Sequence, residues 1–429
     1  ENYGEMTAED VVYSIDQFLH NPESDHPAVT ALNQAGAAVS AVDPYTVRVT
    51  FTAPYLTGPI DISSANNGTG ILSKKFVDEV GLDGARRRAI GTGPYRFVEH
   101  RLSEFMVMEA LSEHWRVVPQ WQTLRILVAP EHSTRLAQVL SGQADIAVLP
   151  GSFKRQADQA RVRTLLNPGV AGVFLVPVVY TENTAGLSRP PNPNNPLANP
   201  RFREALSLAI NRQEIADVVF SGGAIPTGQT DLLPASLGYD RSFETPDPFD
   251  PTRARQILQE IGLAGASFTL QTRPFSGFPE VSQLAEALAA MFEEVGLRPT
   301  LELNVQASRH TELRQTRQLE GVVWIMRLGH LVDTSRRVAS QFACDVENAP
   351  IFTCDDELIA IGKRALATTT VAERDAGLRE FYAYLLDNRI VIPVVDSGTL
   401  YAIGPRVGEW KPRLGERFTT EVERIGHAQ

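Results

Sequence analysis

The chain opens with the segment Thr7-Ala-Glu-Asp-Val-Val-Tyr-Ser14, which follows a glycine at position 4. Thr7 suits an N-cap position, and Asp10 three residues later completes a pattern similar to a capping box. Apolar residues then recur with a helical period at Val11, Val12, Ile15, Phe18 and Leu19. Because Asn21-Pro22 ends this pattern, the sequence predicts a helix over residues 7–19.

Three further segments predict strands. Residues 38–52 indicate two strands around the turn Asp43-Pro44, and the second strand alternates clearly between apolar and polar residues. Two glycines and a proline in Gly91-Thr-Gly-Pro-Tyr-Arg-Phe97 predict a rigid turn into a strand. The longest apolar stretch, residues 172–180, contains a proline and is typical of a buried strand.

The middle of the chain alternates between strands and helices. A strand at 124–129 is followed by a helix at 133–140, a glycine and a short strand within Ser141-Gly-Gln-Ala-Asp-Ile-Ala147. This order favours an α/β lobe. Further helical patterns occupy 200–215, 250–262 and 284–296, and the last two end at glycine. The first of them has an apolar face formed by Phe202, Ala205, Leu206, Ala209 and Ile210.

Composition limits the class of protein. At 429 residues the chain is long enough for two or three domains, and its net charge of -11 disfavours nucleic acid or an anionic membrane as partner. No apolar run approaches the ~18 residues needed to span a bilayer. The motifs of hydrolases, P-loop kinases and HExxH metalloproteases are absent, and the eight histidines are scattered. The sequence therefore predicts neither an enzyme nor a metal or cofactor site.

The motifs, in their order along the chain, resemble those of the family 5 extracellular solute-binding proteins. These are the peptide, opine and nickel receptors of ABC importers. The similar segments are Thr7–Ser14, Gly91–Phe97, Ser141–Ala147 and Pro200–Ile215, with 250–262 and 284–296 matching two later helices. In that family the Thr7–Ser14 segment lies well inside the chain, behind a secretion signal and several strands. We therefore expect the sequence as given to lack its beginning.

The resemblance implies an α/β, two-lobed fold of the periplasmic-binding-protein type (type II, venus-flytrap), with an accessory subdomain. Residues 1–90 would form this subdomain of lobe I, residues 91–182 with 396–429 lobe I itself, and residues 183–395 lobe II. The implied function is that of a monomeric periplasmic or extracellular receptor, free or lipid-anchored. It would close on a peptide-like or acidic solute and deliver it to a membrane permease. A sensor or chaperone of the same fold and a hydrolase with an interdomain site are the alternatives.

The two cysteines, Cys344 and Cys354, are the only ones in the chain. By themselves they could be two unrelated buried thiols or one disulfide, which would add roughly 2.5–3 kcal/mol by the chain-entropy estimate. Family members often have a cysteine pair in this loop, so the resemblance favours the disulfide and an oxidising compartment.

Two segments of the expected lobe II supply candidate ligand-binding residues. The first is Arg273-Pro-Phe-Ser-Gly-Phe278, where Arg273 beside Phe275 could present its guanidinium to a carboxylate. In dipeptide-binding relatives an arginine at about this motif position pairs with the ligand carboxylate. A salt bridge within the protein is the alternative role of Arg273.

The second segment is Val322-Val-Trp-Ile-Met-Arg-Leu-Gly-His-Leu-Val-Asp333. Peptide-binding relatives have a G-W-x-x-D-x-x-D-P motif here, whose aspartate receives the α-ammonium of the ligand. When Asp333 is aligned with the final aspartate, His330 stands at the place of that acid and Arg327 at the place of the tryptophan. Loss of an anion and gain of a cation should disfavour a ligand that bears an ammonium group. Trp324 is either a core residue or a stacking wall of the site.

Overall fold

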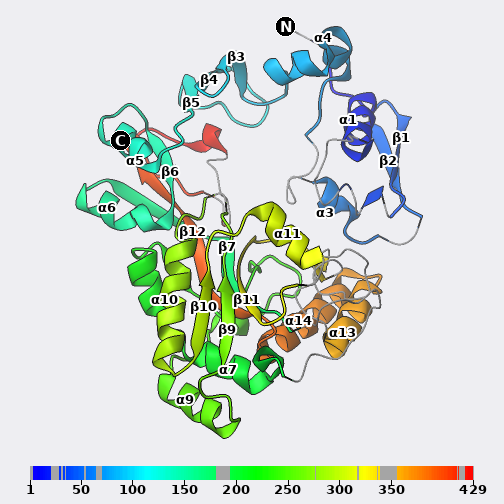
Figure 1. Ribbon diagram of the computed structural model, residues 1–429. Helices are drawn as coiled ribbons and strands as arrows, with labels where there is room; N and C mark the ends of the chain where they lie inside the picture. Colours follow the sequence, from blue (N-terminus) through cyan, green and yellow to red (C-terminus); the bar gives the residue numbers. More distant parts are fainter. Residues whose placement is uncertain are drawn as a thin grey trace. The chain divides into compact units, whose positions relative to one another are not determined.

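The structure is a computed structural model that describes residues 3–20, 29, 32–33, 35–52, 55–63, 70–179, 194–275, 277–315, 318–335, 337–338, 355–412, 414 and 421–428 (Figure 1). Cys344 and Cys354 lie outside these residues, so the expected disulfide stays a prediction. The chain divides into two compact units. Unit 1 comprises residues 1–145, 404–412 and 419–429, and unit 2 comprises residues 146–403 and 413–418. This division does not test the three-part organisation expected from the sequence.

Unit 1 contains a helical layer, a hairpin and a three-stranded sheet. Its elements are α1 (Ala8–His20), β1 (Ala38–Asp43), β2 (Thr46–Thr50), α3 (Gly58–Ile62), α4 (Lys74–Arg87), β3 (Tyr95–Arg101), β4 (Phe105–Ala110), β5 (Thr123–Leu127) and α5 (His132–Leu140). The predicted capping residue acts as expected, since the Asp10 carboxylate accepts the Thr7 N–H at 2.8 Å. The predicted hairpin is also confirmed, with antiparallel pairing from Ala38↔Thr50 to Asp43↔Thr46.

Unit 2 is built on a mixed seven-stranded sheet of order β10-β9-β11-β7-β12-β6, in which β8 also pairs with β12. The strands are β6 (Ile146–Leu149), β7 (Arg163–Pro177), β8 (Ala224–Pro226), β9 (Ser267–Gln271), β10 (Arg298–Glu302), β11 (Val322–Gly329) and β12 (Ile392–Ile403). The helices are α6 (Lys154–Gln159), α7 (Pro200–Leu208), α8 (Arg212–Glu214), α9 (Pro251–Glu260), α10 (Val281–Glu294), α11 (Ala307–Gln315), α13 (Asp356–Leu366) and α14 (Val371–Asp387).

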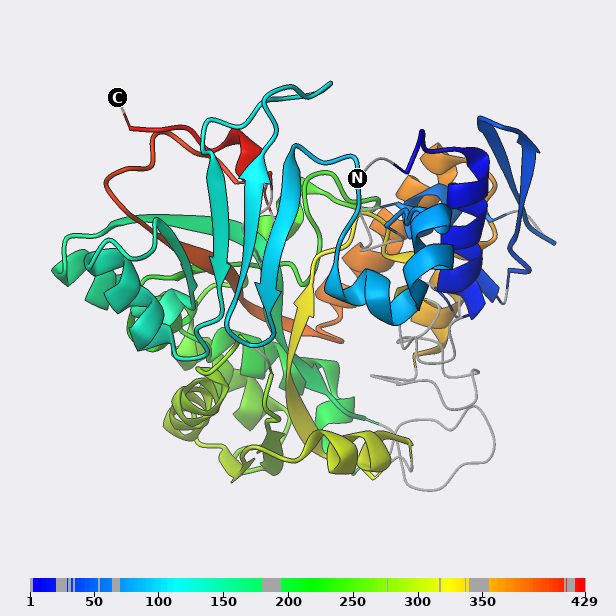
Figure 2. The same cartoon turned by 90° about the horizontal axis from the view of Figure 1, so that it is seen from above.

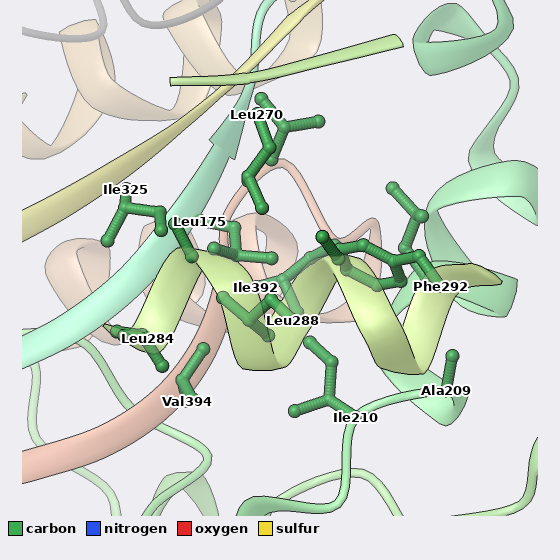
Figure 3. Close-up of a cluster of buried hydrophobic side chains, with 14 of the residues drawn as sticks. Leu175, Ala209, Ile210, Leu270, Leu284, Leu288, Phe292, Ile325, Ile392 and Val394 are labelled. Carbon is green, nitrogen blue, oxygen red and sulfur yellow. The ribbon is translucent and has the colours of Figure 1, made fainter. Parts of the chain in front are cut away.

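Helices cover both faces of this sheet, so its central strands are apolar on both sides (Figure 2). Along β11 the odd-numbered Val323 and Ile325 face the helices α7, α9 and α10, whereas the even-numbered Trp324 and Met326 face α13 and α14. Figure 3 shows the first of these cores, in which α10 places Leu284, Leu288 and Phe292 against Leu175, Leu270, Ile325 and Ile392 of the strands. The first core packs on β7, β9, β11 and β12, and the second core packs on β7 and β11.

The sequence predicts one helix over residues 200–215, but the structure has two separate helical segments there. The five predicted apolar side chains are buried, but α7 ends at Leu208. A new turn starts at Asn211, whose side chain accepts the Glu214 N–H. The break turns the Arg212 guanidinium into the core, where it donates to the Pro393 carbonyl at 2.9 Å. Within the described ranges, no helix is both long enough and apolar enough to span a bilayer.

Candidate functional site

The candidate residues lie at one edge of the unit 2 sheet. Strands β9 and β11 are parallel, and Gln271, the last residue of β9, lies opposite Trp324. Beyond Gln271 the chain leaves the sheet through Arg273 and Phe275, while β11 continues to Gly329. The carboxyl ends of parallel strands share an edge, and ligands of open α/β sheets bind outside such an edge.

Arg273 is a partly buried cation that stacks on aromatic rings. Its guanidinium carbon lies 4.2 Å from the ring centre of Phe275 and 5.9 Å from that of Trp324. Burial lowers the pKa of Arg273 from its usual range, and in the described part of the chain no carboxylate forms an ion pair with it. Its buried Nε also has no hydrogen-bond partner there. The arrangement leaves a preoriented guanidinium with donors to offer to an anion.

A pair of phenyl rings separates this arginine from a second one. The rings of Phe275 and Phe278 lie 6.2 Å apart, and Phe278 in turn stacks on Phe220 with 5.9 Å between centres. The guanidinium carbon of Arg327 lies 5.7 Å from the centre of the Phe278 ring. Each arginine therefore contacts one ring of the pair, and the rings restrict the orientation of both cations.

Arg327 is further oriented by the last strand of the sheet. Its Nε donates to the Ser397 hydroxyl at 3.1 Å, and that hydroxyl donates to the Ala171 carbonyl at 3.1 Å. The contact depends on strand order, because β7 lies between β11 and β12 and pairs with both.

His330, in the loop after β11, faces a carboxylate that the sequence interpretation missed. Its Nε2 lies 3.2 Å from Oδ2 of Asp396, and the two side chains are 1% and 10% exposed. The other Asp396 oxygen accepts the Gly169 N–H at 3.0 Å. Burial raises the pKa of Asp396 to about 7, although the Gly169 N–H and the positive charge of Arg327 both lower it. The sequence offered one indication of this residue, because an acidic residue at the end of the apolar run Ile390–Asp396 is unusual.

Trp324 and Asp333 are both buried. Trp324 is 1% exposed and packs its ring 4.0 Å from that of His310 in the core of unit 2. Asp333 is 3% exposed, and its carboxylate accepts the Ser335 N–H at 2.7 Å. The structure thus brings Arg273, Phe275 and Trp324 together. Asp396 contacts His330 and is close enough to Arg327 for the positive charge of Arg327 to lower its pKa. Asp333 is part of a local turn beside them.

The donor set of this region suits an organic anion more than a metal. Guanidinium groups and a histidine held by a carboxylate offer hydrogen-bond donors. Among the residues that the structure describes, no three His, Cys, Asp or Glu side chains form a group that could hold a metal ion.

The fold is that of the solute-binding proteins of ABC transporters. The structure matches the substrate-binding protein CtaP from Listeria monocytogenes with a TM-score of 0.78 at 17% identity, over 99% of this chain and 85% of CtaP. It also matches DppA from Helicobacter pylori, solved with the peptide STSA, with a TM-score of 0.67 at 17% identity, over 99% of this chain and 82% of DppA. These matches confirm the mixed α/β, two-lobed fold class.

Residues 2–338 match the model of the bacterial extracellular solute-binding proteins, family 5, and the chain belongs to this family. One relative is the probable ABC transporter periplasmic-binding protein SapA of Escherichia coli K12, which is 25% identical over 92% of this chain and 73% of SapA. Another is the glutathione-binding protein GsiB of Salmonella paratyphi A, which is 28% identical over 70% of this chain. The chain spans only 55% of the length of GsiB.

Proposed function

We propose that this protein is the substrate-binding component of an ABC importer and captures an acidic or peptide-like solute. The observation that carries this proposal is Arg273, which is stacked on Phe275 and forms no ion pair with a described carboxylate. A partly desolvated guanidinium without an internal counter-ion binds a carboxylate favourably, through two parallel hydrogen bonds.

The ligands named for similar proteins agree with this chemistry. GsiB is named for glutathione, DppA was solved with the peptide STSA, and a dipeptide-binding protein from Pseudoalteromonas was solved with Met-Leu. Each of these ligands has at least one carboxylate. In this chain Arg327 places a further permanent cation nearby, which favours a ligand whose acidic groups outnumber its ammonium groups.

The rest of the proposal follows from the family. The receptor works as a monomer outside the cytoplasmic membrane, free or lipid-anchored, and passes its ligand to a permease. It binds the solute without making or breaking a bond, so a chemically unchanged ligand should be recovered from the complex. Recovery of a cleaved product would favour a hydrolase instead, and a partner that is not a permease would favour a sensor.

The test is isothermal titration calorimetry with glutathione, Met-Leu and the C-terminal amide of Met-Leu. We expect glutathione to bind more tightly than Met-Leu, and the amide to bind least. Arg273→Ala should weaken glutathione binding by about tenfold to a hundredfold, the usual worth of a hydrogen bond to a charged group. Arg273→Lys should recover only part of this loss, because lysine lacks the planar fork.

Arg298→Ala is the matched control, since Arg298 is an exposed arginine on β10 of the same sheet. It should leave the affinity unchanged. Tight binding of Met-Leu that is insensitive to both Arg273→Ala and Arg327→Ala would rule out the proposed ligand class.

A further inference from the structure

Asp396 and His330 form a buried acid–base pair beside Arg327. The atoms Asp396 Oδ2 and His330 Nε2 lie 3.2 Å apart, and the histidine side chain is 1% exposed. The two residues come from different elements, because Asp396 belongs to β12 and His330 to the loop after β11. Strand β12 has a register shift on each side of Asp396, between Pro393 and Val395 and between Ser397 and Thr399. Such bulges re-aim side chains.

Asp396 is faced by groups from several elements that the structure describes. Strand β7 offers the Gly169 N–H, β11 offers the cation Arg327, and the following loop offers His330. Strand β8 places the apolar Ile225 opposite Asp396. Asp396 thus has the permanent positive charge of Arg327 and the Gly169 backbone donor acting on it.

We propose that Asp396 and His330 exchange one proton with solvent, and that an anionic ligand beside Arg327 is bound together with that proton. The inference rests on the proposed function and deepens it. It makes Asp396 a specificity-determining residue that acts through His330 and Arg327 and does not itself touch the ligand.

Counting charges shows how the pair acts. With one proton on the pair, the pair is neutral and the cluster with Arg327 has a net charge of +1. Without that proton, the Asp396 carboxylate cancels Arg327 and the net charge is zero. A ligand carboxylate is attracted to the first state more than to the second, so binding favours proton uptake. Burial makes this difference large, because water screens the charges less.

The first measurement needs no ligand. The side-chain carboxyl carbon of Asp396 is followed by ¹³C NMR as a function of pH, and its signal is identified by its loss in Asp396→Asn. This substitution keeps an oxygen acceptor for the Gly169 N–H. We expect a midpoint within about one unit of pH 7, and a shift of that midpoint in His330→Gln. A midpoint below about pH 5, or one that ignores His330→Gln, would overturn proton exchange in the pair.

The second measurement is calorimetric titration of glutathione between about pH 6 and about pH 7.5, in buffers that differ in ionisation enthalpy. Over this range a free thiol with a pKa of about 8.5 stays mostly protonated. We expect uptake of up to one proton, hence an affinity that falls by up to about tenfold per pH unit as the pH rises. Asp396→Asn should abolish the uptake, whereas Asp217→Asn, a change at an exposed aspartate, should preserve it.

The two measurements separate the two proposals. Glutathione that binds without proton uptake supports the proposed function and overturns the coupling. Glutathione that fails to bind counts against the proposed ligand class, while the NMR midpoint still decides whether the pair exchanges a proton.

Discussion

Single arginines of unit 2 have contrasting roles that depend on their partners. Arg203 is buried and donates to four backbone carbonyls, those of Leu197, Ala198, Asn388 and Arg389. Burial lowers its pKa to about 10, so it stays charged at neutral pH. These donors are used inside the protein, which makes Arg203 a structural residue. Arg273 has aromatic contacts and, among the residues that the structure describes, no such set of acceptors, which is why it is the residue we assign to the ligand.

Asp396 should make the stability of the protein depend on pH. Burial raises the pKa of Asp396 from 3.8 to about 7, so between these pH values the folded protein binds more protons than the unfolded chain. The free energy of unfolding should therefore fall as the pH rises from about 4 to about 7, by at most about 4 kcal/mol. Urea unfolding of the wild type and of Asp396→Asn at both ends of this range measures the effect.

In Asp396→Asn this contribution should vanish, so the variant should gain stability relative to the wild type at about pH 7 compared with about pH 4. An equal difference between the two proteins at both pH values would show that Asp396 does not titrate in this window.

The residues of the site differ in how far sequence could predict them. Arg273 and Phe275 are neighbours in one loop, so their stacking follows from local sequence. The pairing of His330 with Asp396 could not be predicted, because it requires β7 to lie between β11 and β12. Strand order is a property of the whole sheet, and the apolar runs of these strands do not specify it.

Whole elements were predicted well where a local signal marks their ends. Helices α9 and α10 end before Gly262 and Gly296, and both glycines have a positive φ, of 70° and 91°. The break after α7 was not predicted. It depends on Asn211 acting as an N-cap and on acceptors for Arg212 in distant β12.

Two glycines should respond differently to substitution by alanine, for different reasons. At Gly262 the added Cβ meets no atom within 4 Å, so the cost is only that of a left-handed backbone, about 1–2 kcal/mol. At Gly172 in β7 the Cβ would overlap the Thr230 carbonyl oxygen, and backbone atoms cannot move aside easily. Gly172→Ala should therefore cost more than about 4 kcal/mol or prevent folding.

Chemical unfolding of the two variants measures these costs. Similar stabilities for Gly172→Ala and Gly262→Ala would show that β7 and the Thr230 segment do not approach each other as described.

At the scale of the whole molecule, the two units have separate cores of different size. The described core of unit 1 is small and centres on Ile15, Leu19 and Leu32, whereas unit 2 has two large cores on either face of its sheet. Two-state unfolding is an approximation that holds for small single domains. Because this chain consists of two compact units, we expect more than one unfolding transition. The ratio of van't Hoff to calorimetric enthalpy should be below one.

A saturating acidic ligand should act mainly on the transition of unit 2, where Arg273 and Arg327 lie. At a hundredfold excess over its dissociation constant it should add about 2.7 kcal/mol. Scanning calorimetry with and without glutathione tests both expectations. A single transition with equal enthalpies would show that the chain unfolds as one cooperative body.

The position of β12 near the end of the chain has a consequence for synthesis. Strand β6 ends at Leu149, yet β12, which pairs with β6, β7 and β8, begins only at Ile392. A ribosome that adds 5–20 residues per second needs roughly 10–50 s to make the intervening chain. During this interval β6 waits for its partner β12, and β7 can pair with β11 on one side only, so the exposed strand edges can pair with other chains. We therefore expect a nascent polypeptide of this kind to be prone to aggregation until strand β12 has emerged.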